Sequence, residues 1–451
     1  SRHIISNCGA WSASDAMVSV AAPSNGSLRE PLLARRTAGG KTEEEDGARC
    51  GTPCSSAVNL AATAMGTGML TLPYAFARCG PRRCLVILAV IAATTDITLT
   101  LLVRVGRAMG LRTFGGIMRR LFGDAGSAIF QAMMIGVLFL ALTAMQRVVL
   151  DLLPIFLEEA LGRVKGSLSP MAVSLPVNIA VLVACLSKSF HALRFTSGAA
   201  LACLLPFVCA ISGKAMATKM DPSTPASPSL DTGSLDGILL APPLIASAFC
   251  CHFSILDIDL ELQPRYRSRI YGVIHIVALG VLPATYATVA LSGVSLFGAN
   301  TAENVLVQFE NDAMMHFARG VLSVTNALRM PLMTVPLYRL LSEFLSGLPS
   351  KGAAAAPTAS TAEANPMGML VLLVLSLSAA QRMRVLTSVM GLLGGTGGVL
   401  GCYCMPGLMV LALRREGGGA KEAAWWGVAA VGAVLIGVCV ALATALTWRP
   451  A

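Results

Sequence analysis

The sequence predicts an all-α integral membrane protein, and three observations support this fold class. Of the 451 residues, 55% are hydrophobic and only 13% are charged, whereas soluble domains contain about 25% charged residues. Many apolar runs reach or approach the roughly 20 residues that a helix needs to cross a bilayer. Two of these runs are interrupted near their middle, which a bilayer tolerates only where the freed backbone groups find partners.

Eleven segments are apolar enough to be interpreted as spanning helices. They cover residues 55–80, 84–105, 125–153, 171–186, 195–216, 237–262, 271–297, 315–341, 367–380, 385–413 and 425–448. The polar residues 1–50, with an acidic run at 43–46, predict a disordered cytosolic tail, and residues 51–448 then form the transmembrane domain. Pro- and Ser-rich loops are expected at 219–236 and 346–365.

The first span is interrupted by Gly66-Thr67-Gly68 and, further on, by Pro73. In hydrocarbon an unpaired backbone N–H or C=O is costly, so a broken span must line a cavity or be buried in protein. Close packing of another helix on the glycine pair is the alternative interpretation. The sixth span carries small and polar residues at 246–252, where a helix could open, and glycines at 394–398 break the tenth.

The two main breaks lie five spans apart. Matching breaks of this kind are typical of a five-plus-five inverted repeat with a ligand site at the repeat interface, as in secondary transporters. The eleventh segment has tryptophans at both ends, Trp425 and Trp448, as an aromatic belt at the two interfaces predicts. Loop charges favour a cytosolic N-terminus, with the basic loop after span one as the exception.

Three stretches of the sequence form motifs. The first-span motif comprises Asn59-Leu60, Gly66-Thr67-Gly68-Met69-Leu70 and Leu72-Pro73-Tyr74-Ala75. The others are Phe249-Cys250-Cys251-His252, Ile255-Leu256 and Glu261-Leu262 in span six, and Phe195-Thr196-Ser197-Gly198 at the start of span five. These motifs resemble those of the amino acid/auxin permease family, which includes the sodium-coupled neutral amino acid transporters. The resemblance implies a five-plus-five inverted repeat, an eleventh helix, and amino acid transport coupled to protons or sodium.

The chain departs from the pattern of this family at three positions. Relatives usually carry Pro where this chain has Asp257, and an aromatic residue is common where Asp259 stands. Sodium-dependent members have an Asn in the first half-helix, at a position that aligns with Ala62. The loss of that ligand argues against sodium coupling.

A free amino acid would need partners for its two charged groups at the breaks. Its carboxylate would accept hydrogen bonds from backbone N–H groups at the start of the second half-helix, and its ammonium would bind carbonyls opened in span six. The N–H candidates are Thr67, Gly68, Met69 and Leu70, and the carbonyl candidates lie around Ser247, Ala248 and Phe249. The Thr67 hydroxyl could donate to the substrate or bond back to its own helix.

Ionisable residues inside spans are costly and by default indicate function. They are Asp96, Arg147, Asp151, His252, Asp257, His275 and Arg329. Arg147 and Asp151 are four residues apart, so we expect an ion pair on one helix face. His275 is expected to be a satisfied interior histidine. Two arginines at 265 and 267 could neutralise the carboxylates at 257 and 259.

The coupling ion is inferred from spans one, six and eight. The ion-coupling candidates are His252, Asp257, Ser323, Thr325 and Arg329. If Arg329 faces the interior, it would repel a sodium ion about 6 Å away by roughly 3 kcal/mol at an effective dielectric near 20, and could replace that ion electrostatically. A proton carried by His252 or a span-six carboxylate would then drive transport. If Arg329 snorkels toward a loop instead, a sodium site would stay intact.

The sequence therefore predicts a secondary transporter that moves amino acids, either proton-coupled or facilitative. Its partners are an amino acid, a proton and the lipid bilayer of the plasma membrane or of a vacuole or lysosome, with sodium less favoured. An amino-acid-binding membrane sensor without net transport and a sodium-coupled symporter are the alternatives. We predict no enzyme activity, cofactor, metal or nucleic-acid partner: Gly395–Gly398 lacks the lysine of a phosphate-binding loop, and basic residues are dispersed among short loops.

Overall fold

The computed structural model describes residues 51–111, 113–186, 194–220, 234–309, 312–346, 365–383, 386–415 and 423–447. The predicted tail at 1–50 lies outside this part of the chain, as do most of the loops predicted at 219–236 and 346–365. Each segment predicted as a span contains helix. Six stretches of the described residues are long and apolar enough to cross a membrane by length and composition.

The helices follow the predicted segments closely. The first half of the chain forms α2 (Pro53–Ala64), α3 (Leu72–Cys79), α4 (Pro81–Met109), α5 (Phe114–Ala160), α6 (Pro170–Leu186) and α7 (Arg194–Met220). The second half forms α8 (Leu235–Ala248), α9 (His252–Glu261), α10 (Ile270–His275), α11 (Leu282–Phe297), α12 (Ala313–Ser346), α13 (Pro366–Arg382), α14 (Leu386–Gly395), α15 (Gly397–Val399), α16 (Met405–Arg415) and α17 (Ala423–Thr447). Short turns join several of them: η1 (Thr67–Thr71), η3 (Pro264–Arg269), η4 (Ile276–Val281), η5 (Gly298–Asn300), η6 (Val305–Gln308) and η7 (Leu400–Cys404).

The first predicted break is present between α2 and α3. Helix α2 ends at Ala64, Met65 is extended, and Gly66 leaves the helical region before the 3-10 turn η1 begins. Pro73 lies in the first turn of α3, where a missing N–H removes no intrahelical hydrogen bond. The start of α2 is fixed by a capping box, because Thr52 and Ser55 exchange side-chain and backbone hydrogen bonds.

The second predicted break separates α8 from α9. Helix α8 ends at Ala248, Phe249 and Cys251 have non-helical backbone angles, and α9 starts at His252. A backbone bridge joins the beginning of the first broken helix to the end of the second. Gly51 donates to the Glu261 carbonyl (3.0 Å) and accepts from the Gln263 amide (3.1 Å).

The third segment extends beyond its predicted bounds. Helix α5 begins at Phe114, within the basic stretch predicted as a loop, and is kinked at Gly123. A positive φ of 71° is accessible to glycine at little cost, and Arg119 and Asp124 form an ion pair (2.9 Å) across the kink. The chain therefore turns at Gly123 within one nearly continuous helix.

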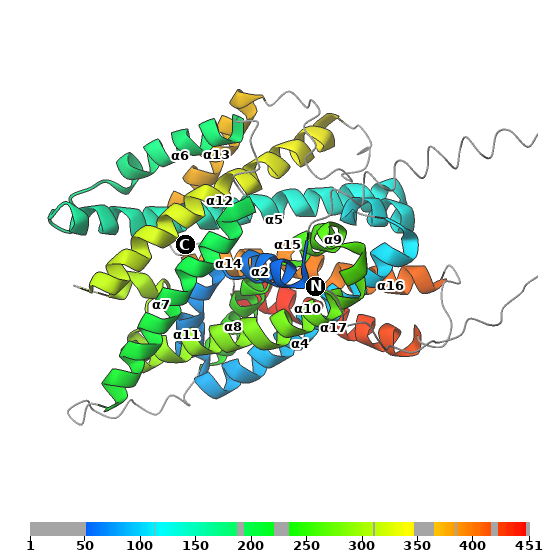
Figure 1. Cartoon of the computed structure of the whole chain (residues 1–451), viewed down its shortest axis with the longest axis horizontal. Coiled ribbons are helices and arrows are strands. Elements are labelled where there is room, and N and C mark those ends of the chain that lie inside the picture. The colour runs from blue at the N-terminus through cyan, green and yellow to red at the C-terminus, as the bar shows by residue number, and fades with distance from the viewer. Residues whose placement is uncertain are drawn as a thin grey trace, which may run out of the picture. The chain divides into compact units, whose positions relative to one another are not determined.

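The helices pack around two apolar cores. A large core joins α2, α3, α4, α8, α11 and α14 with the facing sides of α5 and α12. A smaller core lies among α5, α6, α12 and α13, which pack against one another (Figure 1). Between α5 and α6 the buried side chains of Gln146 and Asn178 bond to each other (2.6 Å). The broken helices thus lie in the larger core, and α5 and α12 belong to both.

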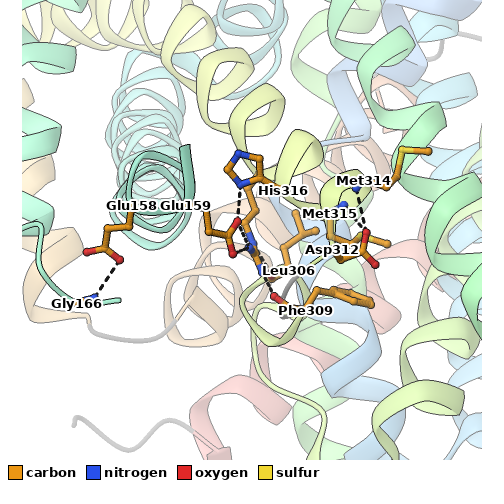
Figure 2. A network of polar contacts seen from close by, with 10 residues as sticks. Glu158, Glu159, Gly166, Leu306, Phe309, Asp312, Met314, Met315 and His316 are labelled. Atoms are coloured by element: carbon orange, nitrogen blue, oxygen red, sulfur yellow. Dashed lines mark hydrogen bonds and ion pairs between the residues drawn. The ribbon is translucent and has the colours of Figure 1, made fainter. Parts of the chain in front are cut away.

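A polar network joins α5, α12 and the segment before α12 at one end of the helices (Figure 2). Arg319, buried in α12, donates to the Glu159 carboxylate (2.8 and 2.9 Å), the Leu306 carbonyl (3.0 Å) and the Phe309 carbonyl. His316 also contacts Glu159. One guanidinium therefore holds the turn η6 against the two helices.

Asp312 caps the start of α12 beside this network (Figure 2). Its carboxylate accepts from the amides of Met314 (3.0 Å) and Met315 (3.1 Å) and pairs with Lys214 on α7. Burial raises the pKa of the Asp312 carboxyl, but the bonds from Lys214 and the two amides outweigh it, so the pKa lies below its ordinary value. The carboxylate is therefore charged at neutral pH.

We expect Arg319→Met to destabilise the protein by about 3 kcal/mol, because it breaks a buried ion pair. This value is at the low end for such pairs, since Glu159 is partly exposed. Two backbone carbonyls would also lose their donor. The measurement is thermal unfolding of the purified protein in detergent. The matched control is Arg163→Met at an exposed position of the same end, which should shift stability by less than about 0.5 kcal/mol. Equal melting temperatures for both variants would contradict the assignment.

Candidate functional site at the two helix breaks

A cavity of about 370 Å³ lies where the two broken helices meet α5, α12 and α14. This volume falls within the range of small-molecule sites, about 300–1,000 Å³. Its polar and charged lining residues are Thr63, Thr67, Ser247, Ser254, Asp257, Asn326 and Arg329. Its methionines are Met134, Met145, Met333 and Met390. A second cavity of equal volume surrounds Arg107 and Asp259, but no residue of either break lines it.

The predicted substrate contacts fall into two groups. Thr67, Gly68 and Ser247 line the cavity. The other four are fully buried and do not line it: Met69, Leu70, Ala248 and Phe249. Thr67 and Ser247 thus line the cavity at the two breaks. The four buried residues that follow them pack into the core and hold both breaks in place.

The two breaks pack directly on each other through Gly68. A Cβ atom on Gly68 would lie 2.8 Å from the Ala248 Cα and 3.2 Å from the Ala248 amide nitrogen. The Ala248 carbonyl, freed by the break, accepts from the buried Tyr286 hydroxyl (2.6 Å), and the Tyr286 ring meets Phe249 edge-on. Both interpretations of the glycine pair therefore hold at Gly68: another helix packs closely against it, and it also lines the cavity.

Helix α14 fits against α8 in a similar way. A Cβ atom on Gly394 would overlap the Pro243 carbonyl and lie 2.8 Å from the Ser247 amide. One turn earlier, the Met390 thioether lies 3.8 Å from the Thr67 hydroxyl and 3.7 Å from the Ser247 hydroxyl. Thr67 thus donates to a sulfur from α14 rather than to a carbonyl of its own helix. Met390 joins both breaks to the tenth segment.

Arg329 reaches from α12 to the end of the first half-helix. Its guanidinium donates to the Ala62 carbonyl and, at 3.4 Å, to the Met65 carbonyl. These carbonyls belong to the last turn of α2, where no intrahelical donor follows. The arginine therefore faces the interior, and a fixed positive charge occupies the place where the freed carbonyls would bind a cation.

His252 lies beside the break but not in the cavity. It is fully buried, its Nε2 lies 2.7 Å from the Thr98 hydroxyl, and its ring meets Tyr403 edge-on. Its Nδ1 has no hydrogen-bond partner among the described residues. Asp257, in contrast, lines the cavity. Of the two proton-carrying candidates, the carboxylate is the one that the cavity reaches.

The span-six carboxylates do not follow the pairing expected from sequence. Asp259 binds Arg107 on α4 in a two-point contact (2.5 and 3.1 Å), and not Arg265 or Arg267. Arg107 also donates to the Arg267 carbonyl (2.7 Å), so Arg107 and Arg267 are close in space. The sequence distance of more than 150 residues concealed this ion pair.

The span-eight oxygens have separate environments. Ser323 is buried and donates to the Arg319 carbonyl of its own helix (2.8 Å), and Thr325 is half-buried outside the cavity lining. Asn326, on the same helix, does line the cavity. The structure thus brings Asn326 and Arg329 to the site and leaves the other two outside it.

Two further expectations concerned ionisable residues within spans: an ion pair of Arg147 with Asp151, and an interior position for His275. The predicted ion pair between Arg147 and Asp151 is confirmed. His275 is not interior: its side chain is 52% exposed, and its Nδ1 lies 2.6 Å from Asp96 on α4. Because the exposed ring covers a largely buried carboxylate, the pair is satisfied at the surface of the helical bundle.

Sequence reasoning missed the cavity wall formed by α5. The lining residues Met134, Val137, Leu138, Ala141 and Met145 recur at helical spacing and lie on one face. This periodicity was visible in the sequence, but an apolar face on a spanning helix can equally contact lipid. Met390 carried no local signal, because its role depends on contacts with residues 143 and 323 positions away.

Two solved structures have a similar fold at low sequence identity. Mhp1, a nucleobase-cation-symport-1 family transporter in a closed conformation with bromovinylhydantoin bound, is 14% identical, with a TM-score of 0.56 over 90% of this chain and 95% of that one. MhsT in complex with L-phenylalanine is 11% identical, with a TM-score of 0.55 over 89% of this chain and 99% of that one. The chain therefore shares the helical fold of these two structures.

Residues 49–448 match the family model of the transmembrane amino acid transporter proteins, and the chain belongs to this family. This confirms the resemblance found in the motifs and agrees with the prediction that the chain is not an enzyme. Amino acid transporter AVT6A of Arabidopsis thaliana is 27% identical over 279 residues, which are 57% of this chain and 59% of the relative. AVT6E of the same plant is 24% identical over 79% of this chain and 75% of its own length.

An animal relative shows similar divergence. Solute carrier family 38 member 10 of Homo sapiens is 22% identical over 380 residues, covering 82% of this chain and 33% of the human protein. The alignments with AVT6A and AVT6B span 59% of the length of each of these relatives. The chain thus spans less than two thirds of the length of these three relatives.

We expect Gly68→Ala to lower folding stability by about 1–3 kcal/mol, because the added methyl group overlaps the backbone of Ala248. The two breaks would be forced apart, so transport should also fall. Thermal unfolding in detergent and uptake per folded protein are the measurements. Gly136→Ala, on α5 with open space around it, is the matched control: it should leave uptake unchanged and should not lower stability, because alanine favours a helix more than glycine does. A fully stable Gly68→Ala protein would refute the close contact.

Proposed function

We propose that this protein is a secondary transporter that binds an amino acid at the two helix breaks and carries it across a membrane. The observation that carries the proposal is the cavity bounded by both breaks, since discontinuous helices offer backbone groups that continuous helices do not. The family and the transporter folds support amino acid transport.

The proposed topology is that of eleven spans, of which spans one to ten form a five-plus-five inverted repeat. Spans one and six are the broken pair α2–α3 and α8–α9, and α17 is the eleventh. The N-terminus and the tail at 1–50 are proposed to be cytosolic, with residues 51–448 as the transport domain. The membrane is the plasma membrane or that of a vacuole or lysosome.

The substrate carboxylate is proposed to bind the amides of Thr67 and Gly68. These N–H groups begin the turn η1, where no acceptor within the turn precedes them, whereas the Met69 amide already donates to the Gly66 carbonyl (3.3 Å). The Thr67 and Ser247 hydroxyls lie beside them. The four methionines of the lining offer flexible, polarizable contacts to an apolar side chain.

The coupling ion is proposed to be a proton, with facilitative transport as the alternative. Arg329 already donates to the Ala62 and Met65 carbonyls, so a sodium ion there would meet a fixed positive charge. Asp257 is the titratable carboxylate in the cavity lining and is the proposed proton carrier. Its charge would be neutralised on the side of the membrane with the lower pH.

We expect uptake into proteoliposomes to persist when choline replaces sodium. Uptake should rise as external pH falls from about 7.5 to 5.5, because a lower external pH favours protonation of the proposed carrier, Asp257. Asp257→Asn should abolish this pH response while His252→Gln should retain it. Uptake that vanishes in choline and ignores pH would exclude proton coupling and restore the sodium-coupled alternative. Binding without accumulation under any ion gradient would favour the sensor.

We expect Arg329→Gln to reduce uptake by more than tenfold, because a buried charge-assisted hydrogen bond contributes about 1.5–3 kcal/mol and the end of α2 would lose its donor. Arg339→Gln, an exposed position on the same helix, is the matched control. Uptake should be measured in sodium and in choline. Unchanged, sodium-independent uptake by Arg329→Gln would refute the role of this arginine.

A further inference from the structure

Two thiols meet where the sixth and tenth segments touch. The Sγ atoms of Cys250 and Cys402 lie 3.3 Å apart, and both cysteines are free. A disulfide places two sulfur atoms about 2.0 Å apart, so a movement of roughly 1.3 Å would bring these two to bonding distance. The two cysteines are 152 positions apart in the chain, so a bond between them would link two separate segments.

Both cysteines lie in backbone that is not regular α-helix. Cys250 is in the break between α8 and α9, and Cys402 is in the π-helical turn η7. The Cys250 sulfur also lies 3.1 Å from the position of a Cβ on Gly398, so glycine leaves room for this side chain. A break and a π-turn can adjust their dihedral angles locally, because neither is held by a full ladder of i to i−4 hydrogen bonds.

Only one of the two thiols has a path to solutes. Cys250 is half-buried and lines the cavity at the breaks, whereas Cys402 is fully buried. A small solute that enters the cavity therefore reaches the Cys250 sulfur first. Cys402 can react only with its neighbour. This arrangement is that of an attacking thiol with a resolving thiol beside it.

We infer that Cys250 and Cys402 form a redox modification site that hydrogen peroxide converts to a disulfide. The Cys250 thiol loses its proton, and the thiolate attacks one peroxide oxygen. The O–O bond breaks, the departing hydroxide takes up that proton and leaves as water, and Cys250 becomes a sulfenic acid. The Cys402 sulfur then attacks the Cys250 sulfur, its proton joins the departing hydroxide, and a second water leaves. The two thiols lose two electrons, and the peroxide gains them.

The disulfide would join the break of the sixth segment to the tenth. Met390 already contacts both breaks from the same tenth segment, at Thr67 and Ser247. A covalent link on the other side of the break would fix the distance between α8–α9 and η7. Any transport cycle that changes this distance would stop, and a reducing agent would restart it.

The disulfide is tested without reference to transport. The full-length protein in detergent is treated with hydrogen peroxide, remaining thiols are alkylated, and peptides are analysed by mass spectrometry. We expect a linked peptide pair containing residues 250 and 402, which disappears after dithiothreitol. Cys250→Ser and Cys402→Ser should each lack it. Cys404→Ser is the matched control, because Cys404 lies in the same turn but its sulfur faces the Val434 carbonyl, and it should retain the link.

Two outcomes would overturn the inference. One is full alkylation of both thiols after peroxide with no linked peptide. The other is a linked peptide that persists in Cys250→Ser, which would assign the reaction to the adjacent Cys251. Uptake is then measured with and without peroxide: it should fall and recover with dithiothreitol in the wild type and remain constant in Cys250→Ser. If the wild type shows no uptake in either state, the proposed function fails while the disulfide assignment stands.

Discussion

The hydrogen bonds from Arg329 to the last turn of α2 make the central break possible. A helix that stops inside an apolar core leaves carbonyls without partners, and no water is available there to replace them. A guanidinium offers five donors in a fixed plane and stays charged, so one side chain can satisfy several of these oxygens. With the carbonyls satisfied, the chain can turn at Gly66 and place Thr67 and Gly68 in the cavity lining.

This constraint determines which neighbours can surround the site. Arg329 comes from α12, which also packs with α5 in the smaller core, so the charge is supplied by the helices outside the broken pair. The broken helices meet each other through Gly68 and Ala248, and α14 meets them through Gly394. Small residues bring the backbones together where the chain opens, and larger side chains such as Met390 fill the remaining space.

The sequence predicted features that depend on neighbouring positions. Glycines and a proline within an apolar run indicated the first break, and a spacing of four residues indicated the pair of Arg147 and Asp151. Features that depend on distant contacts were not predictable in the same way. Asp96 with His275 and Arg107 with Asp259 join residues more than 150 positions apart, and no local pattern marks such partners. The cavity wall on α5 was not predictable either. Its periodicity shows which residues share one face of the helix, but not whether that face contacts the cavity or lipid.

The backbone bridge between Gly51 and Leu262 has a mechanical consequence. It ties the segment just before α2 to the end of α9. The absence of a side chain at Gly51 lets the two backbone segments approach, since a Cβ there would lie 2.7 Å from the Glu261 carbonyl oxygen. The bridge thereby joins the N-terminal end of the half-helix α2 to the C-terminal end of the half-helix α9. Movement of one half-helix alone would break these two backbone hydrogen bonds, so the bridge couples the two half-helices at this end.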